Sequence, residues 1–280
     1  FLQAVGTALA SERRVIKNVS YVASGEGTTS QGEFHEAVNW ASREKLPVLF
    51  CIQNNKYAIS VPVSQQSGGK SNSIAEMMAG YDNLRRFHID GTDFVTAYQS
   101  VTEAIEYIKS GKGPVLIEAD VVRLESHSSS DDHKKYRSIE EIERDKERCP
   151  ISRLSSYMLH HDLATTQEID DLRQQVIAEI NQAAELAEDE KNPEPETAEK
   201  FVFDESGYKE SLVYEKNKPV GKSIVMVDAI NHALHEELRK NPDIYVFGED
   251  IADGKGGVFT ATTAFSTTFG TKRVFNSPPP

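Results

Sequence analysis

The chain has 280 residues, 38% of them hydrophobic, and a formal net charge of −13. This is enough apolar material to bury one large core, or one core and part of a second, so we expect a globular protein. The negative charge argues against nucleic acid and anionic membrane surfaces as partners, because both would repel the chain. No apolar run in the sequence approaches the roughly 20 residues that span a bilayer. The expected partners are therefore small molecules or other proteins.

Cysteine use and the start of the chain bear on location. The two cysteines, Cys51 and Cys149, form no CxxC pair and no zinc-like cluster with histidines, which favours a reducing compartment. We therefore predict a cytoplasmic protein. The first residues, 1–4, already fit a helical pattern, so any targeting segment would precede this chain.

The first part of the sequence alternates between short apolar runs and stretches of helical period. Strands are expected over 19–24, 47–52, 87–90 and 114–121, and helices over 33–45 and 96–110. This order is typical of a doubly wound α/β domain with a mostly parallel sheet.

A long helix and a linker are expected next. Thr165 to Glu168 forms a capping box before a segment that has Ile169, Leu172 and Ile180 on one face, which predicts a long amphipathic helix. After Leu186 the sequence becomes acidic and rich in proline, as in a linker or a solvated segment.

A second alternation begins near the end of the chain. A helix is expected over 225–240, a strand over 243–248 and a glycine-rich turn over 253–257. We therefore predict the start of a second α/β domain.

The stretch from Gly25 to Asn55 contains the clearest candidate site. Gly25-Glu26-Gly27 follows an expected strand, and its glycines would let backbone N–H groups approach a diphosphate beside the next helix N-terminus. Glu26 would repel a phosphate unless a divalent cation lies between them. Asn54 and Asn55 end the next expected strand, and amide oxygens suit Mg²⁺. Since parallel sheets bind ligands at the carboxyl ends of their strands, a metal-diphosphate site is expected here. Taken separately, the two segments favour a tight turn and an ordinary loop.

The same stretch resembles a known cofactor motif. GEG, followed after 26 residues by NN, is similar to the fingerprint of thiamin diphosphate-dependent enzymes. The surrounding sequence, GEGTTSQGEFHEAVNWASREKLPVLFCIQNNKYAIS, resembles the α-subunit of branched-chain 2-oxo acid dehydrogenases. The segments IEADVVRLESHSSSDDHKKYRS and CPISRLSSYML extend this likeness over nearly all of residues 1–204. The resemblance implies the thiamin diphosphate-binding fold.

The resemblance also implies a set of cofactor contacts. Glu26 and Asn55 would bind Mg²⁺ through their side chains, and Tyr57 would add its backbone carbonyl. Contacts with thiamin diphosphate are expected from Gly25, Gly27, Thr28, Gln53 and Asn54. One position departs from the family, because Gln53 stands where some relatives carry arginine. We expect residues upstream of this chain to compensate the phosphate charge instead.

The serine-rich loop over 124–138 contains His127, which matches the family's active-site histidine. An imidazole exchanges protons near neutral pH, so it suits the acyl transfer to a lipoyl group that the family performs. Composition alone favours a solvated loop with incidental histidines. Ser128 and Ser138 match regulatory phosphorylation sites of mitochondrial relatives, although unmodified serines are the simpler interpretation.

Residues 223–280 resemble the beginning of the family's β-subunit. The expected organisation is an α-like domain, a linker and a truncated β-like domain, over 1–204, 205–222 and 223–280. In the β-subunit pattern an active-site glutamate lies three residues after the proline of an Asn-Thr-Pro segment. The matching segment here is Asn276-Ser277-Pro278, which puts that glutamate directly after Pro280. We therefore expect negligible turnover from residues 1–280 alone.

The resemblance implies oxidative decarboxylation of a 2-oxo acid, of the branched-chain class, with acyl transfer to lipoamide of a partner acyltransferase. A homo-oligomer is expected. Two alternatives stay open. Another thiamin diphosphate enzyme, such as a pyruvate or acetoin dehydrogenase or a transketolase-like enzyme, would share the metal site and accept another substrate. A non-catalytic scaffold would keep the fold and bind no cofactor.

Overall fold

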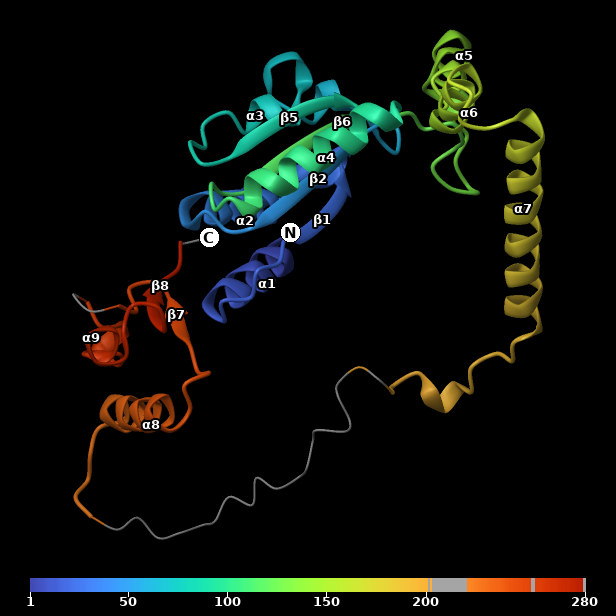
Figure 1. Ribbon diagram of the computed structural model, residues 1–280. Helices are drawn as coiled ribbons and strands as arrows, with labels where there is room; N and C mark the ends of the chain where they lie inside the picture. The colour runs from blue at the N-terminus through green and yellow to red at the C-terminus, as the bar shows by residue number, and fades with distance from the viewer. Residues whose placement is uncertain (201, 203–220, 253–254, 279–280) are drawn as a thin grey trace.

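The computed structural model of the chain is built around a four-stranded sheet, shown in Figure 1. It describes all residues except 201, 203–220, 253–254 and 279–280. The strands run parallel in the order β1-β2-β6-β5. Their bounds are Ser20–Gly25 for β1, Val48–Asn54 for β2, Arg85–Asp90 for β5 and Val115–Asp120 for β6. The two central strands are almost continuously apolar because both of their faces are covered.

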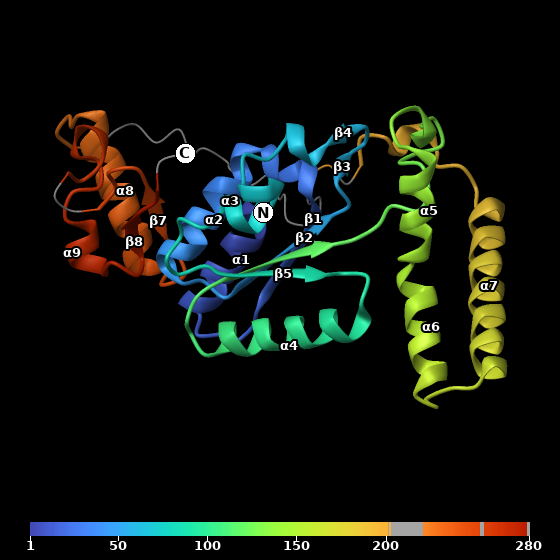
Figure 2. The same ribbon diagram turned by 90° about the horizontal axis from the view of Figure 1, so that it is seen from above.

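Helices cover both faces of this sheet (Figure 2). On one face lie α1, α2 and α3, and on the other lies α4. Their bounds are Leu2–Arg13, Gly32–Glu44, Ile74–Met77 and Phe94–Lys109. Successive side chains of a strand point to opposite faces of the sheet. Phe50 and Leu116 therefore lie in the core beneath α1, α2 and α3, and Leu49 and Ile117 lie in the core beneath α4. The predicted doubly wound parallel sheet is confirmed.

A helical extension follows the sheet and projects away from it in both views (Figures 1 and 2). It consists of α5 (Ile139–Glu147), α6 (Pro150–His160) and α7 (Thr166–Asp189). The capping box predicted at Thr165 and Glu168 is present. The expected apolar face of α7 is exposed, with Leu172 at 60% and Ile180 at 61%. The predicted helix is therefore confirmed, and its apolar face lies open among the described residues.

The predicted linker lies mostly outside the described residues. Helix α7 continues to Asp189, three residues beyond the point where the sequence turns acidic. Of the predicted linker 205–222, only 221 and 222 belong to the described residues, and 253–254 of the predicted glycine-rich turn lie outside them as well. Within the described ranges, the helices are all too short or too polar to cross a membrane.

The C-terminal unit contains α8, β7, α9 and β8. Their bounds are Met226–Lys240, Val246–Gly248, Phe265–Phe269 and Val274–Asn276. The strands β7 and β8 pair in parallel, and Leu238, Phe265 and Val274 form a small core. The helix and strand predicted here are confirmed. The unit contacts the first domain through the rings of Trp40 and Phe247, whose centroids lie 6.2 Å apart.

Candidate cofactor site

The candidate site lies where β1 and β2 end. Parallel pairing sets Gly25 beside Gln53, so the residues that follow each strand emerge at the same edge of the sheet. After β1 the chain enters a short 3-10 helix, Glu26–Ser30, before α2 begins. The backbone N–H of Asn55 lies 3.4 Å from Oε2 of Glu26. Glu26 and Asn55, the two predicted side-chain ligands of the metal, are therefore neighbours.

The Glu26 side chain is buried, with 1% of its surface exposed. Its Oε1 atom has no hydrogen-bond partner among the described residues. Burial raises the pKa of Glu26, while backbone hydrogen bonds at Glu26 and Asn55 and the charges of Arg123 and Lys56 oppose this rise. A buried carboxylate with an unused oxygen is costly by itself and suits a hard divalent cation. The site therefore fits Mg²⁺ by the chemistry of its donors.

The two neighbouring asparagines are used in different ways. The Asn54 amide is buried, donates to Oε1 of Glu118 at 2.7 Å and accepts from the backbone N–H of Lys56 at 2.9 Å. The Asn55 amide oxygen accepts only from the backbone N–H of Tyr57, at 3.1 Å, as far as the described residues show. An amide oxygen has two lone pairs, so Asn55 keeps one for a further partner. The cofactor role of Asn54 stays a prediction, since its side chain is engaged within the protein.

Gly25 and Gly27 differ in the space available for a side chain. A Cβ atom on Gly27 would lie 2.6 Å from Cβ of Ala58, in the short hairpin of β3 (Tyr57–Ala58) and β4 (Val61–Pro62). Gly27 is thus required for the hairpin to approach, a role beyond the diphosphate contact predicted for it. A Cβ atom on Gly25 would meet only the Gln53 carbonyl oxygen, at 3.9 Å.

Two further predicted residues, Thr28 and Gln53, have exposed side chains at this edge. Within the described part of the chain, neither side chain hydrogen-bonds to another protein group, so both are open to a ligand. Their contacts with thiamin diphosphate stay predictions.

Arg123, which no sequence motif predicted as a site residue, lies at the same site. The Arg123 guanidinium lies over the rings of Tyr57 and Tyr136, at 5.9 and 5.8 Å from their centroids, and donates to the Tyr136 hydroxyl at 2.8 Å. Its Nε and Nη1 atoms are buried and have no partner within the described part of the chain. Arg123 also lowers the pKa of Glu26 by its charge. It therefore offers unused donors close to the candidate metal ligand.

His127, the predicted catalytic histidine, is linked to Arg123 through hydrogen bonds of Asp131 and Tyr136. The backbone N–H of His127 donates to Asp131 Oδ2 at 2.9 Å, and the Tyr136 hydroxyl donates to the same oxygen at 2.6 Å. These two hydrogen bonds lower the pKa of Asp131, and the bond from Tyr136 has the larger effect. The His127 side chain itself is exposed. The structure thus fixes the backbone of His127 and leaves its ring accessible.

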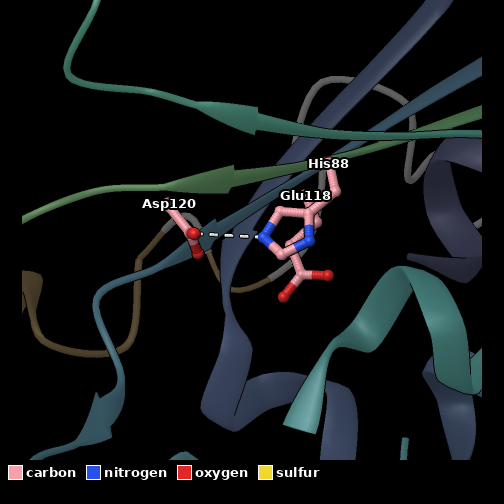
Figure 3. Close-up of side chains that lie close together, drawn as sticks. All are labelled: His88, Glu118 and Asp120. Carbon is pink, nitrogen blue, oxygen red and sulfur yellow. Dashed lines mark ion pairs between the residues drawn. The ribbon is translucent and has the colours of Figure 1, made fainter. Parts of the chain in front are cut away.

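A second cluster of possible metal ligands lies on β5 and β6. His88, Glu118 and Asp120 bring one ligand atom each to within 4.8 Å of one another (Figure 3). Both oxygens of Glu118 already accept hydrogen bonds, because Oε1 accepts from Asn54 and Oε2 accepts from the Ser73 hydroxyl at 2.5 Å and from a backbone N–H at 2.8 Å. These bonds outweigh the effect of burial and lower the pKa of Glu118. The cluster therefore fits a cation less well than Glu26, whose Oε1 is unused.

Comparison with known proteins assigns the chain to a family. A family model described as "Dehydrogenase E1 component" matches residues 1–196. The chain belongs to the dehydrogenase E1 component family. This confirms the resemblance over the α-like region; the likeness of residues 223–280 to a β-subunit stays a prediction.

Individual relatives of this family support the same assignment. The chain is 37% identical over 200 residues to "2-oxoisovalerate dehydrogenase subunit alpha" of Bacillus subtilis, a match that covers 71% of this chain and 60% of the relative. It is 40% identical over 157 residues to "3-methyl-2-oxobutanoate dehydrogenase subunit alpha" of Mycobacterium tuberculosis, covering 56% and 42%. It is 32% identical over 186 residues to "Pyruvate dehydrogenase E1 component subunit alpha" of Mycoplasma pneumoniae, covering 66% and 51%. The chain thus spans about half the length of the curated relatives that it matches.

Proposed function

We propose that this chain binds thiamin diphosphate with Mg²⁺ where β1 and β2 end, and that it serves in the oxidative decarboxylation of a 2-oxo acid. The observation that carries the proposal is the buried Glu26 carboxylate, which has an unused Oε1 and lies beside Asn55. A buried carboxylate of this kind is stabilised by a bound cation. Membership in the dehydrogenase E1 component family supports the same proposal.

The residues of the site divide into metal and phosphate contacts. Mg²⁺ would be held by the side chains of Glu26 and Asn55 and by the backbone carbonyl of Tyr57. Gly27 and Thr28 would meet the diphosphate, and Gly25, Gln53 and Asn54 would add further contacts with the cofactor. Since Gln53 is neutral, we assign positive charge at the phosphate to Arg123, whose Nε and Nη1 are unused within the described structure. When bound, thiamin diphosphate supplies the carbon nucleophile that makes loss of carbon dioxide possible.

His127 would act at the later transfer step. Its backbone is held by Asp131, which keeps the loop in place, while its exposed ring is open to a large substrate. An imidazole at this position would exchange a proton during acyl transfer to the lipoyl group of a partner acyltransferase. Loss of the ring would then slow the transfer to lipoamide and spare cofactor binding.

The proposed substrate is a branched-chain 2-oxo acid. The names of the Bacillus subtilis and Mycobacterium tuberculosis relatives, a 2-oxoisovalerate and a 3-methyl-2-oxobutanoate dehydrogenase subunit, support this class. The similarity to a pyruvate dehydrogenase subunit of Mycoplasma pneumoniae favours pyruvate as the second candidate. Rates of the assembled enzyme with 3-methyl-2-oxobutanoate and with pyruvate, measured side by side, separate the two: a higher kcat/KM with pyruvate would overturn the branched-chain assignment.

The organisation of the chain is also part of the proposal. We infer an α-like domain over 1–204, a linker over 205–222 and a β-like region over 223–280. The separate small core of Leu238, Phe265 and Val274 supports a distinct C-terminal region. A cytoplasmic homo-oligomer that engages a lipoyl-bearing acyltransferase completes the proposal.

Calorimetric titration of thiamin diphosphate in the presence of Mg²⁺ tests the cofactor assignment. The chain should bind the cofactor, and Glu26→Gln should reduce the affinity at least tenfold, because a neutral amide replaces a charged metal ligand. Equal binding by both proteins would contradict the metal assignment. If neither binds, with or without an added β-like partner subunit, the non-catalytic scaffold becomes the better interpretation.

A further inference from the structure

Lys56 has an unusual backbone conformation. It lies directly after Asn55 and has a φ of +74°. Residues with a side chain disfavour this left-handed region, where the Cβ atom is crowded, whereas glycine adopts it freely. The conformation is held on both sides by hydrogen bonds, since the Lys56 N–H donates to Asn54 at 2.9 Å and its carbonyl accepts from Val63 at 2.8 Å. The turn that presents Asn55 therefore contains a strained residue.

The Lys56 side chain is anchored on the neighbouring strand. Its Nζ forms an ion pair and hydrogen bond with Oδ1 of Asp120, the last residue of β6, which the sheet register sets beside Asn54. The other oxygen of Asp120 lies 3.1 Å from Nε2 of His88 on β5 (Figure 3). Asp120 thus joins the turn after β2 to two further strands, and His88 restricts where the Asp120 carboxylate can lie.

We propose that Asp120 is a positioning residue of the cofactor site and acts through Lys56. By holding the Lys56 side chain, Asp120 offsets the strain of the left-handed backbone and keeps the Asn55 N–H and amide where they meet Glu26 and a metal ion. Partners that orient metal ligands in this way influence metal affinity without touching the metal. The inference rests on the proposed function, because it assigns Asn55 to the metal.

A double-mutant cycle tests this role. Mn²⁺ replaces Mg²⁺ as a spectroscopic probe, and its affinity is measured with thiamin diphosphate present in the parent, Asp120→Asn, Lys56→Gly and Lys56→Gly/Asp120→Asn proteins. Asp120→Asn should weaken Mn²⁺ binding about tenfold in the parent. In the Lys56→Gly background the same substitution should change the affinity less than about twofold, because glycine has no strain to offset.

Other outcomes of the cycle overturn the proposal. Equal weakening in both backgrounds would mean that the Asp120 charge acts on the site without Lys56. An unchanged affinity in Asp120→Asn would remove Asp120 from the site altogether. Glu103→Gln is the matched control, because it removes another exposed ion pair, with Arg85, that lies away from the turn. It should bind Mn²⁺ like the parent.

Amide hydrogen exchange without metal or cofactor provides an independent readout. Asp120→Asn should speed exchange at the Lys56 and Tyr57 amides about tenfold, and the addition of Lys56→Gly should remove that increase. If the parent binds neither Mn²⁺ nor thiamin diphosphate, the proposed function fails, and the exchange data still decide whether Asp120 holds the turn. Unchanged exchange in Asp120→Asn would contradict the positioning role.

Discussion

The carboxylate of Glu26 and the backbone N–H of Asn55 meet at the carboxyl edge of the sheet, 3.4 Å apart, although 28 residues separate them in the chain. Parallel pairing of β1 with β2 produces this meeting, because both strands end at the same edge. One carboxylate oxygen faces Asn55, and the other is buried without a partner among the described residues. The pair therefore combines a structural contact with an unused ligand atom.

Glu26→Gln should stabilise the protein when no divalent cation is present. Burial raises the pKa of Glu26 above its ordinary value of 4.5, so the folded state holds the proton more tightly than the unfolded state does. The tighter binding of this proton stabilises the folded state fully below pH 4.5, and the stabilisation is lost as the pH rises through the raised pKa. At pH 7 the variant should gain about 1 kcal/mol in the free energy of unfolding, a typical value for a buried polar group without a partner.

Denaturant unfolding from pH 4 to pH 8, without cation, measures this effect. The difference between the parent and the variant should shrink toward pH 4. The matched control is Glu106→Gln, which replaces an exposed carboxylate on α4 and should leave the stability unchanged at every pH. A variant that is less stable than the parent at pH 7 would show that the charged form of Glu26 is already satisfied.

Gly27→Ala should destabilise the fold, because the new methyl group would collide with Cβ of Ala58. Forcing a methyl group into such a contact costs about 1–3 kcal/mol. Ala58→Gly removes the opposing methyl group, so the double variant should recover most of the loss in thermal unfolding. Gly25→Ala is the control for stability, because its methyl group would meet only a carbonyl oxygen at 3.9 Å. Failure of Ala58→Gly to restore stability would place the strain elsewhere.

Tyr136→Phe should loosen the loop that contains His127. The substitution removes the hydroxyl that donates to Asp131 and accepts from Arg123. Loss of about 1 kcal/mol of local stability corresponds to roughly fivefold faster amide exchange over residues 127–131. Tyr98→Phe, on the exposed face of α4, serves as the control. Exchange that is unchanged in Tyr136→Phe would mean that Asp131 holds the His127 amide without help.

Asp90, at the end of β5, forms ion pairs with Arg148 and Arg153, and these pairs should weaken only in strong acid. Burial would raise the pKa of Asp90, but hydrogen bonds from Thr92 and Arg153 outweigh it and hold this pKa well below the usual range. The ionised Asp90 carboxylate stabilises the folded state above pH 3.8, and this stabilisation is lost as the pH falls toward the lowered pKa. Asp90→Asn should therefore cost about 0.5–1 kcal/mol near pH 7, as expected for an exposed charge pair.

Thermal unfolding at pH 7 and at pH 2 checks this prediction. The stability difference between parent and Asp90→Asn should narrow at pH 2, where protonation begins to remove the ion pairs with Arg148 and Arg153 from the parent as well. Asp82→Asn, in an exposed loop, controls for a general loss of negative charge. A difference that grows in acid would contradict the assigned pKa shift.

Much of the fold was predictable because the central strands are long apolar runs and the main helices have clear periodicity. The strands β1, β2, β5 and β6 lie within two residues of the expected ranges. The short elements were not predicted: β3 and β4 contain two residues each, too few to show a period. The exposed apolar face of α7 also had no signal in the sequence, since an amphipathic pattern does not say what covers it.

The site was predictable only in part. The meeting of Glu26 and Asn55 follows from where two strands end, and strand alternation accounts for why Asn54 turns inward toward Glu118 instead. The place of Arg123 depends on contacts with Tyr57 and Tyr136, which come from other segments of the chain. No local pattern identifies such a contact. Metal and cofactor binding by these residues stays a prediction.

The most direct test of the site is a titration of Mn²⁺, with thiamin diphosphate present, into the parent, Glu26→Gln and Glu106→Gln proteins, followed by electron paramagnetic resonance. The parent and Glu106→Gln should each bind one Mn²⁺ ion with equal affinity, and Glu26→Gln should lose at least tenfold in affinity. If Glu26→Gln binds Mn²⁺ as tightly as the parent, the metal lies elsewhere, and the assignment of Glu26 and Asn55 is wrong.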